Sequence, residues 1–556
     1  MRGVSSMSLS LPAAARLVSA SVGAVAVALT GCAQLQPMPS DPAGRLFGRS
    51  LDQIAELYIV PVSSRRLALG AANRLSLLDP NFGLAESPGP NSQFEIVLNY
   101  GGREIAAYPS PSADDPHVWG GWLGKLEADA KKASPIVAAQ PQDTIDKALF
   151  DGITSGLDRF SRYATPQVAR DHRAARDGFG GIGATLDEEG DPFRITKIIA
   201  GSPADLAGIR VGDRIVVVDG APAAGRSQND VIRQLRGPVS SMVVVSIARP
   251  GLSANRSFRL QRALIVMPTV TMTRSNGIAV FHISGFNQNT TQQLVEDLQS
   301  IEREAGQPVR GIVLDLRGDP GGLLDQAVSL ADVFIAKGPI VATVGRNPAS
   351  RQYFEASGDA VAPRIPIVVL LDGGSASASE IVAAALQDSG RAVVVGTSSY
   401  GKGTVQTVLR LPNDGELTLT WAELIAPADY SLNGHGVVPT VCTSDLGNDA
   451  LSIEVALRRA SEVSSAQPIA VAPRATLDEQ GWSALRRSCP PRPGDRAIDT
   501  AVAERLLADP VLYSQAAHMI GANPSLAAKP ASGAAAPAGP ALTGVSGSLS
   551  FGERHP

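Results

Sequence analysis

The middle of the chain alternates between continuous apolar runs and stretches with apolar residues at helical spacing. Three runs, Gly277–Phe286, Gly311–Arg317 and Ile367–Leu371, are apolar at nearly every position and rich in β-branched residues. Such runs are typical of strands buried on both faces of a sheet. Helical spacing follows each run, from about Asn289, from Leu323 and from Glu380. This alternation of strand and helix predicts an α/β layered fold.

The pattern before this region differs. Residues 41–165 are predicted to be mainly helical, with helices within Leu51–Leu78 and over Asp143–Tyr163. Between them, Phe94–Tyr108 alternates around Gly101-Gly102 and predicts a β-hairpin. The role of residues 81–142 is left open.

The pattern after the α/β region is helical and then of low complexity. One or two helices are expected after Leu446, most clearly at Ser452–Ser461 and Asp499–Leu507. From Ala522 the chain is mostly Ala, Gly, Pro and Ser, which predicts disorder.

The first forty residues contain no acidic residue. Arg2 and Arg16 precede an apolar run, Leu17–Leu29, which is too short for an ordinary membrane-spanning helix and is typical of a secretory signal. The following Thr30-Gly31-Cys32 resembles a bacterial lipoprotein signal, which implies cleavage before Cys32 and lipid on its thiol. We therefore expect a location in the bacterial cell envelope, on the periplasmic side, with a lipid anchor at Cys32. A plain signal peptide with a chance cysteine is the alternative.

Length, charge and cysteine content narrow the functional classes. A chain of 556 residues is too long for one hydrophobic core, so several domains are expected. The net charge is −4 and no basic block is present, which argues against nucleic acid as a partner. Besides Cys32, only Cys442 and Cys489 are present, and in an oxidising compartment they most simply form a disulfide. Two unpaired thiols are the alternative.

The richest candidate chemistry follows the strand at Ile367–Leu371. A Gly373-Gly374 turn leads to five small residues, Ser375–Ser379, and Glu380 then falls in the first turn of a helix. A serine at such a junction lies near free backbone N–H groups, as a nucleophile that generates an oxyanion requires. A second short strand then leads to the loop Tyr400–Gln406.

The segments GSASASE (374–380) and GKGTVQ (401–406) together resemble the carboxyl-terminal processing peptidases, serine proteases with a Ser–Lys dyad. The resemblance implies that Ser377 is the nucleophile, Lys402 the general base and Gln406 its orienting partner. It also implies a crotonase-like (ClpP/crotonase) core and no metal or organic cofactor. Ser375 and Ser379 are then expected to be structural.

The residue types suit this chemistry. A lysine acts as a base only when neutral, so its pKa must fall from about 10.4 through burial or nearby cations. The neighbours Gly401, Gly403 and Thr404 are uncharged, and Gln406 could accept a hydrogen bond without supplying a counter-ion. The six histidines resemble no base motif, which disfavours a Ser–His–Asp triad.

A second motif supports the first. The sequence LDLRGDPGG (314–322) is similar to the family's L-D-L-R-x-N-x-G-G, whose glycine pair helps to form the oxyanion hole. The matching N–H groups are those of Gly321 or Gly322, with Ala378. Asp319 replaces the usual asparagine, which we expect to matter only if its side chain touches substrate. A plain glycine turn is the alternative reading.

Residues 178–250 resemble a PDZ domain. The loop Phe179–Gly183 matches the glycine-rich loop that holds a peptide's terminal carboxylate, which implies peptide binding at Gly181, Ile182 and Gly183. Ser227–Arg236 is the expected helix beside the groove. Such a domain adds the peptide as an extra strand and binds its last apolar side chain.

Two shorter segments depart from the family pattern. Leu157–Tyr163 is similar to the family's L-D-P-H-S-x-Y, with Arg159 and Phe160 as departures. Gly434–Pro439 resembles the closing G-x-G-[IV]-x-P-D, but Thr440 replaces the aspartate, and His435 is expected to be a structural loop residue.

The expected division of the chain is a signal peptide (1–31), a helical region with the hairpin insertion (32–175), a PDZ domain (176–252), a peptidase core (265–445), a C-terminal helical region (446–521) and a tail (522–556). The resulting hypothesis is a serine endopeptidase that recognises apolar C-termini of proteins and cleaves upstream. Whether a partner protein activates it is left open. Two other classes are a non-catalytic PDZ scaffold and a crotonase-type acyl-CoA enzyme. Intact Ser377 and Lys402 disfavour the first, and an export signal disfavours the second because CoA thioesters are cytoplasmic.

Overall fold

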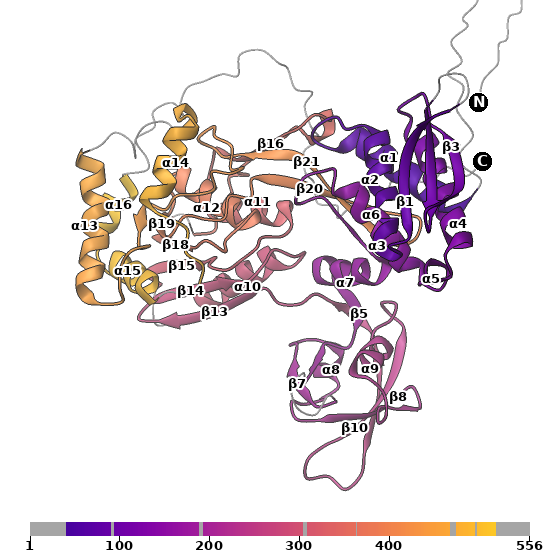
Figure 1. Cartoon of the computed structure of the whole chain (residues 1–556). Coiled ribbons are helices and arrows are strands. Elements are labelled where there is room, and N and C mark those ends of the chain that lie inside the picture. The colour runs from indigo at the N-terminus through magenta and orange to yellow at the C-terminus, as the bar shows by residue number, and fades with distance from the viewer. Residues whose placement is uncertain are drawn as a thin grey trace, which may run out of the picture. The chain divides into compact units, whose positions relative to one another are not determined.

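The structure is a computed structural model that describes residues 41–89, 94–187, 193–303, 309–362, 364–466, 474–494 and 497–518 (Figure 1). The expected signal peptide, the proposed lipid site Cys32 and the tail 522–556 lie outside these residues. Within the described ranges, no helix combines the length and apolar character needed to cross a membrane.

A six-stranded sheet forms the centre of the α/β region. Its strands lie in the order β13-β14-β15-β18-β19-β22, antiparallel between β13 and β14 and parallel elsewhere. The three apolar runs are strands of this sheet, as predicted. The bounds are β13 (Val270–Ser275), β14 (Ile278–Ile283), β15 (Gly311–Asp315), β18 (Ile367–Leu371), β19 (Val393–Gly396) and β22 (Val441–Cys442).

Both faces of this sheet are covered by helices. Val369 and Leu371 of β18 point into one apolar cluster, while Val368 and Leu370 point into another, which is why the run is apolar throughout. The first cluster contains residues of α10 (Thr290–Arg303), α11 (Leu324–Asp332) and α12 (Ala378–Asp388). The second contains residues of α13 (Ala450–Ala466), α15 (Ala497–Ala508) and α16 (Pro510–His518). The expected α/β layering is thus present.

The C-terminal region holds more helices than the one or two predicted. Besides α13, α15 and α16, the described residues include α14 (Glu479–Ser488), whose Trp482 is buried in the first apolar cluster. The short α16 shows little amphipathic pattern, whereas α14 is amphipathic and could have been predicted.

A second sheet carries the strand that follows the Gly-Lys-Gly loop. Its order is β17-β16-β21-β20, and β4 pairs with β21. The bounds are β4 (Arg162–Ala164), β16 (Pro339–Val344), β17 (Gln352–Glu355), β20 (Thr404–Arg410) and β21 (Glu416–Ile425). The Gly-Lys-Gly loop therefore connects the two sheets, since it follows β19 and leads into β20.

The region before Asp177 is mainly helical and has its own core of buried residues. The predicted hairpin is present, and Gly101 and Gly102 adopt φ values of 58° and 77°, as a tight turn with two left-handed residues requires. A third strand, β1, pairs with the hairpin and was not predicted. The elements are α1 (Pro42–Leu57), α2 (Ser64–Asn73), α3 (Leu75–Leu78), β1 (Phe82–Pro88), β2 (Phe94–Tyr100), β3 (Arg103–Pro109), α4 (Pro116–Ala133), α5 (Pro135–Ala138), α6 (Gln142–Thr154) and α7 (Pro166–Asp177).

The predicted helix over Asp143–Tyr163 is too long. Helix α6 ends at Thr154, and Tyr163 lies in β4. The Asp158 carboxylate accepts the N–H of Ser161 at 2.8 Å, so a local side-chain bond stabilises a turn in place of further helix.

Residues 179–265 form a small β-rich unit with a separate apolar cluster. Its α9 lies within the predicted Ser227–Arg236. The elements are β5 (Phe179–Gly181), β6 (Ala184–Leu186), β7 (Ile195–Ile198), α8 (Pro203–Leu206), β8 (Arg214–Val218), β9 (Ala221–Pro222), α9 (Gln228–Leu235), β10 (Met242–Ala248), β11 (Arg256–Gln261) and β12 (Ala263–Ile265).

Candidate active site

Ser377 occupies the junction between β18 and α12, as the N-cap of the helix. Its backbone has φ 57° and ψ −112°, a combination that a residue with a side chain rarely adopts. The strained turn is fixed by its neighbours, because the buried Ser375 hydroxyl donates to the Leu316 carbonyl at 2.8 Å and the buried Ser379 hydroxyl donates to the Asp319 carbonyl at 3.0 Å. Ser375 and Ser379 thus make structural contacts, whereas Ser377 is only half-buried.

One buried carboxylate connects the two candidate catalytic segments. Glu380 accepts the N–H of Ser377 at 2.7 Å, that of Gly401 at 2.7 Å and that of Lys402 at 2.9 Å. It also accepts the hydroxyl of Ser399. Burial raises the pKa of Glu380, and these four hydrogen bonds oppose that rise. The side chain thus fastens the serine turn to the lysine loop.

The Lys402 side chain is half-buried, and its ammonium lies 5.3 Å from the centre of the Phe160 ring. Burial lowers the pKa of Lys402, and the positive charge of Arg162 lowers it further. The carboxylates of Glu380 and Asp158 act in the opposite direction, but the net shift is downward. A lowered pKa is what a lysine general base needs.

The third predicted residue is placed differently from the expectation. The Gln406 amide donates to the Thr404 hydroxyl at 2.8 Å. Among the described residues, the Lys402 ammonium makes no hydrogen bond to Gln406 or to Ser377. Hydrogen bonds between catalytic groups often tighten only when substrate binds. The role of Lys402 as general base therefore stays a prediction.

The glycine pair lies at the nucleophile. Gly321 has φ 95°, and a Cβ added there would lie 2.9 Å from the Ser377 Cβ and 2.8 Å from the Ala378 nitrogen, so only glycine allows this approach. The Gly321 N–H is already used, since it donates to Asp319 at 2.7 Å. Across the described ranges, the N–H groups of Gly322 and Ala378 have no hydrogen-bond partner. They are the pair available to an oxyanion.

Asp319 is fully buried beside this turn. One carboxyl oxygen holds the Gly321 N–H, and the other oxygen, Oδ2, is buried without a hydrogen-bond partner among the described residues. Burial raises the pKa of Asp319 to about 7. An asparagine could accept the same Gly321 N–H through its Oδ1, so aspartate differs here by its ability to ionise.

Sequence reasoning noted the departures at Arg159 and Phe160 without giving them a role. In the structure, the Phe160 ring contacts the Lys402 ammonium, and the Arg159 guanidinium lies 4.7 Å from the Phe160 ring centre. The Arg162 charge was missed altogether. The sequence did indicate this segment, because Leu157–Tyr163 matches a family motif although it lies far from the catalytic motifs in sequence.

Comparisons with known proteins identify the family of the chain. The model of Peptidase family S41 matches residues 277–443, and that of the PDZ domain matches residues 173–248. A carboxy-terminal-processing protease of Bartonella bacilliformis is 37% identical over 310 residues, covering 55% of this chain and 71% of that protein. The chain belongs to peptidase family S41, among the carboxy-terminal processing proteases.

Two further relatives are more distant. The carboxy-terminal processing protease CtpA of Bacillus subtilis is 32% identical over 307 residues, covering 54% of this chain and 65% of that protein. Among solved structures, a photosystem II D1 C-terminal processing protease is 26% identical, with 68% of this chain and 92% of that chain covered and a TM-score of 0.32. This chain is thus a serine-type peptidase with a PDZ domain.

The PDZ domain of this S41 peptidase contains a pocket of about 260 Å³. It is lined on one side by the predicted peptide-binding residues Gly181, Ile182 and Gly183 and on the other by Ile232 and Leu235 of α9. The lining is largely apolar, as the last side chain of an apolar peptide would need.

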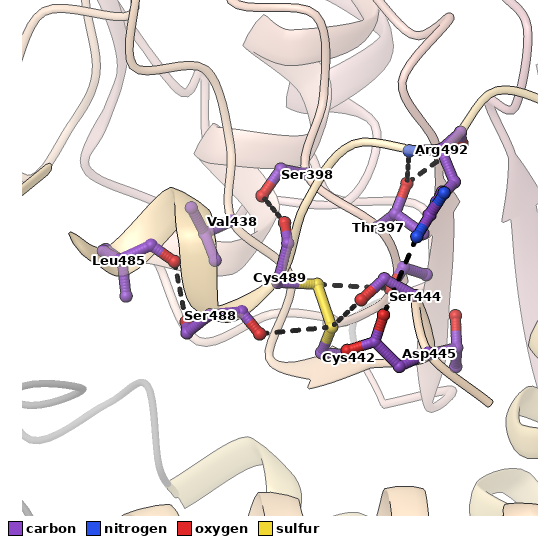
Figure 2. Close-up of a disulfide and its surroundings, with 12 residues drawn as sticks. Thr397, Ser398, Val438, Cys442, Ser444, Asp445, Leu485, Ser488, Cys489 and Arg492 are labelled. Atoms are coloured by element: carbon purple, nitrogen blue, oxygen red, sulfur yellow. Dashed lines mark hydrogen bonds and ion pairs between the residues drawn. A yellow bond between two sulfur atoms is a disulfide. The ribbon is translucent and has the colours of Figure 1, made fainter. Parts of the chain in front are cut away.

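Cys442 and Cys489 form a disulfide in this S41 peptidase. Cys442 ends β22, and Cys489 is the C-cap of α14, so the bond joins the central sheet to the C-terminal region (Figure 2). Near it, the Ser398 hydroxyl donates to the Cys489 carbonyl at 2.6 Å, as Figure 2 shows.

Proposed function

We propose that this S41 peptidase cleaves peptide bonds with Ser377 as nucleophile and Lys402 as general base, and that its PDZ domain binds the apolar C-terminus of the substrate. The observation that carries the proposal is the Glu380 carboxylate, which accepts N–H groups from both Ser377 and Lys402. Family membership supports the reaction class, and the intact GSASASE and GKGTVQ segments support the residues.

The proposed steps follow from the contacts. Lys402 in its neutral form takes the proton of the Ser377 hydroxyl as the oxygen attacks the scissile carbonyl. The Ala378 and Gly322 N–H groups stabilise the oxyanion, with Gly321 held close to Ser377 by Asp319. Lys402 then protonates the leaving amine, and water hydrolyses the acyl-enzyme by the same route in reverse. Gln406 donates through its Nε2 to Thr404, and its Oε1 is the atom that would accept from Lys402 in the proposed role.

The finer architecture is part of the same proposal. The division is a signal peptide at 1–31, an N-terminal region to 175, the PDZ domain at 176–252, a crotonase-like core at 265–445 and a helical region to 521.

The proposed location is the periplasmic side of the cell envelope, with lipid at Cys32. An activating adaptor protein is a further possible partner. The acid-free N-terminus, the strand–helix alternation and the buried central sheet support these assignments.

Cleavage of an unstructured protein with an apolar C-terminus tests the dyad. Full-length wild type is compared with Ser377→Ala, Lys402→Ala and the control Lys337→Ala, which removes an exposed lysine. We expect both dyad variants to lose at least about a thousandfold in kcat/KM, while the control cleaves like wild type. Cleavage by either dyad variant at the wild-type rate would show that the site lies elsewhere.

The second candidate is a PDZ scaffold that binds C-termini without cutting them, which the preformed apolar pocket favours. Fluorescence anisotropy with an apolar-ended peptide, measured on the same preparation, separates the two. Binding without cleavage, unchanged after membrane vesicles are added, would support the scaffold.

A further inference from the structure

The segment 474–494 lies beyond the residues that the S41 model matches, yet it packs against the loops of the active site. Trp482 of α14 is buried and stacks on His435, with ring centres 4.5 Å apart. His435 is the loop residue expected to be structural. Its Nε2 lies 3.4 Å from the Glu479 carboxylate. The contacts fix α14 to the loop that precedes β22.

Arg486 extends from α14 toward the catalytic loops. Its guanidinium donates to the Ser399 carbonyl at 3.0 Å and to the His435 carbonyl. A Cβ added at Gly436 would lie 2.9 Å from the Arg486 Nη1, 2.9 Å from the Glu380 Oε1 and 2.5 Å from the Ser399 Oγ. The arginine, the connecting glutamate and the serine thus surround one glycine.

The disulfide holds this helix from its C-terminal end. Cys489 follows Arg486 by three residues and is bonded to Cys442 of the central sheet. After it, the Arg492 carbonyl accepts the N–H of Gly373, in the turn before Ser377, at 3.0 Å, and the hydroxyl of Thr397, before the lysine loop, at 3.1 Å (Figure 2). The segment therefore contacts the turn before Ser377 and the strand end before the Lys402 loop.

We propose that Arg486 is a positioning residue for the catalytic dyad. It holds the Ser399 loop and supplies a positive charge near Glu380, so that Glu380 keeps the backbones of Ser377 and Lys402 in place. The Cys442–Cys489 disulfide holds α14, which carries Arg486, against the central sheet. The inference rests on the proposed Ser377–Lys402 function and extends the working site beyond the matched family region.

The charge of Arg486 has a defined consequence for pH. Within the described ranges, the charged and titratable groups near Glu380 are Arg486 on α14, Lys402 in the adjoining loop and Tyr430 before the glycine loop. Burial raises the pKa of Glu380, and the Arg486 charge favours the ionised carboxylate. Without Arg486, Glu380 becomes protonated at a higher pH and accepts the three N–H groups less strongly. As the solution is acidified, the activity of a variant without Arg486 should therefore begin to fall at a higher pH than that of wild type.

The test measures kcat and KM from pH 5 to 9 for full-length wild type, Arg486→Leu, Arg486→Lys and the control Arg487→Leu. Arg487 is the exposed neighbour on the same helix, bonded only to Ser483 in the described structure. We expect Arg486→Leu to lower kcat by about tenfold or more with KM changed less than about twofold, and to shift the acid limb upward. Arg486→Lys should restore the acid limb in part, and Arg487→Leu should match wild type. A wild-type kcat and pH profile for Arg486→Leu would overturn the proposal.

A second variant separates positioning from folding. Cys442→Ala/Cys489→Ala leaves Arg486 in the chain but releases its helix, and its kcat is measured well below its melting temperature, with circular dichroism to verify the fold. We expect a lower kcat with native secondary structure, and treatment of wild type with dithiothreitol should reproduce it. If Arg486→Leu does not fold, an unchanged kcat in the double variant overturns the proposal. Failure of the underlying function looks different, since wild type would then be inert or Ser377→Ala would still cleave.

Discussion

This S41 peptidase has two glycine loops that are assigned to bind oxygen atoms, and they are fixed in different ways. The loop at Gly321-Gly322 is held by the buried carboxyl group of Asp319. It lies against the turn of Ser377, which the buried carboxyl group of Glu380 holds. The PDZ loop at Gly181–Gly183 lies beside an apolar pocket and is held by backbone bonds, such as that from the Ile199 N–H to the Gly183 carbonyl at 2.9 Å.

The difference reflects the two tasks. A loop that binds a carboxylate already charged in solution needs shape and N–H groups, which strands and apolar packing provide. A loop that stabilises a charge appearing only during reaction must be held rigidly in place beforehand, and hydrogen bonds to buried carboxyls provide this at a desolvation cost. We therefore expect catalytic geometry to depend on hydrogen bonds to buried carboxyls and tail binding to depend on packing.

Glu380→Ala should have the largest effect of the four changes that follow. It leaves three backbone N–H groups without an acceptor and releases Ser377 from Lys402, so we expect kcat/KM to fall by about a hundredfold or more. Glu479→Ala, which removes an exposed carboxylate, is the control, and it should keep most of the activity. If Glu380→Ala retains more than a third of wild-type kcat/KM, charge does not hold the catalytic loop.

Gly183→Val should act on tail recognition. Gly183 has φ 79°, and a Cβ there would lie 2.2 Å from the Ser202 Cβ, so valine distorts the PDZ loop. We expect kcat/KM for a substrate with an apolar C-terminus to fall by about tenfold, more than for a short generic peptide. Equal losses on the two substrates would contradict the separation of the two loops.

Asp319→Asn should change the pH profile by a few-fold. Because the Asp319 pKa is raised to about 7, wild type gains a negative charge beside Gly321 as the pH rises through 7, and that charge opposes an oxyanion. The ratio of variant to wild-type kcat should therefore rise between about pH 6 and pH 8. The folded state prefers the protonated acid, so wild-type stability should also fall as pH rises from about 4 to 7, and thermal melts of the variant should lack that fall. A constant activity ratio would show that the carboxyl stays in one protonation state.

Phe160→Leu should give the smallest effect. Leucine keeps Lys402 buried but removes the aromatic face that favours the ammonium, so the pKa of Lys402 should fall further. The acid limb of kcat/KM should move down by the same amount, and a pH profile in a single buffer mixture measures it. An upward movement would mean that burial by the ring outweighs its attraction for the cation.

The sequence was most informative where a local pattern determines the structure. The strand Ile367–Leu371 matched β18 residue for residue, because a strand buried on both faces leaves a continuous apolar run. The motif residues Ser377 and Lys402 lie in adjoining loops, as the resemblance to the family implied.

Other features depended on contacts between distant segments. The role of Glu380 as a shared acceptor was not predicted, since its position in the first turn of α12 was explained by the helix alone. Arg486 follows Ser377 by more than a hundred residues and shows no motif. Strand β1 was not predicted because it contains Gly83, Ser87 and Pro88, which are typical of turns. Its pairing with β2 stabilises it as a strand.

The loop that carries the proposed base, Lys402, connects the two sheets. Ser377 follows β18 of the six-stranded sheet, and Lys402 precedes β20 of the other sheet. Because the loop of Lys402 runs from β19 to β20, its position depends on both sheets. If the proposed dyad is correct, we expect cleavage to begin only after both sheets have folded.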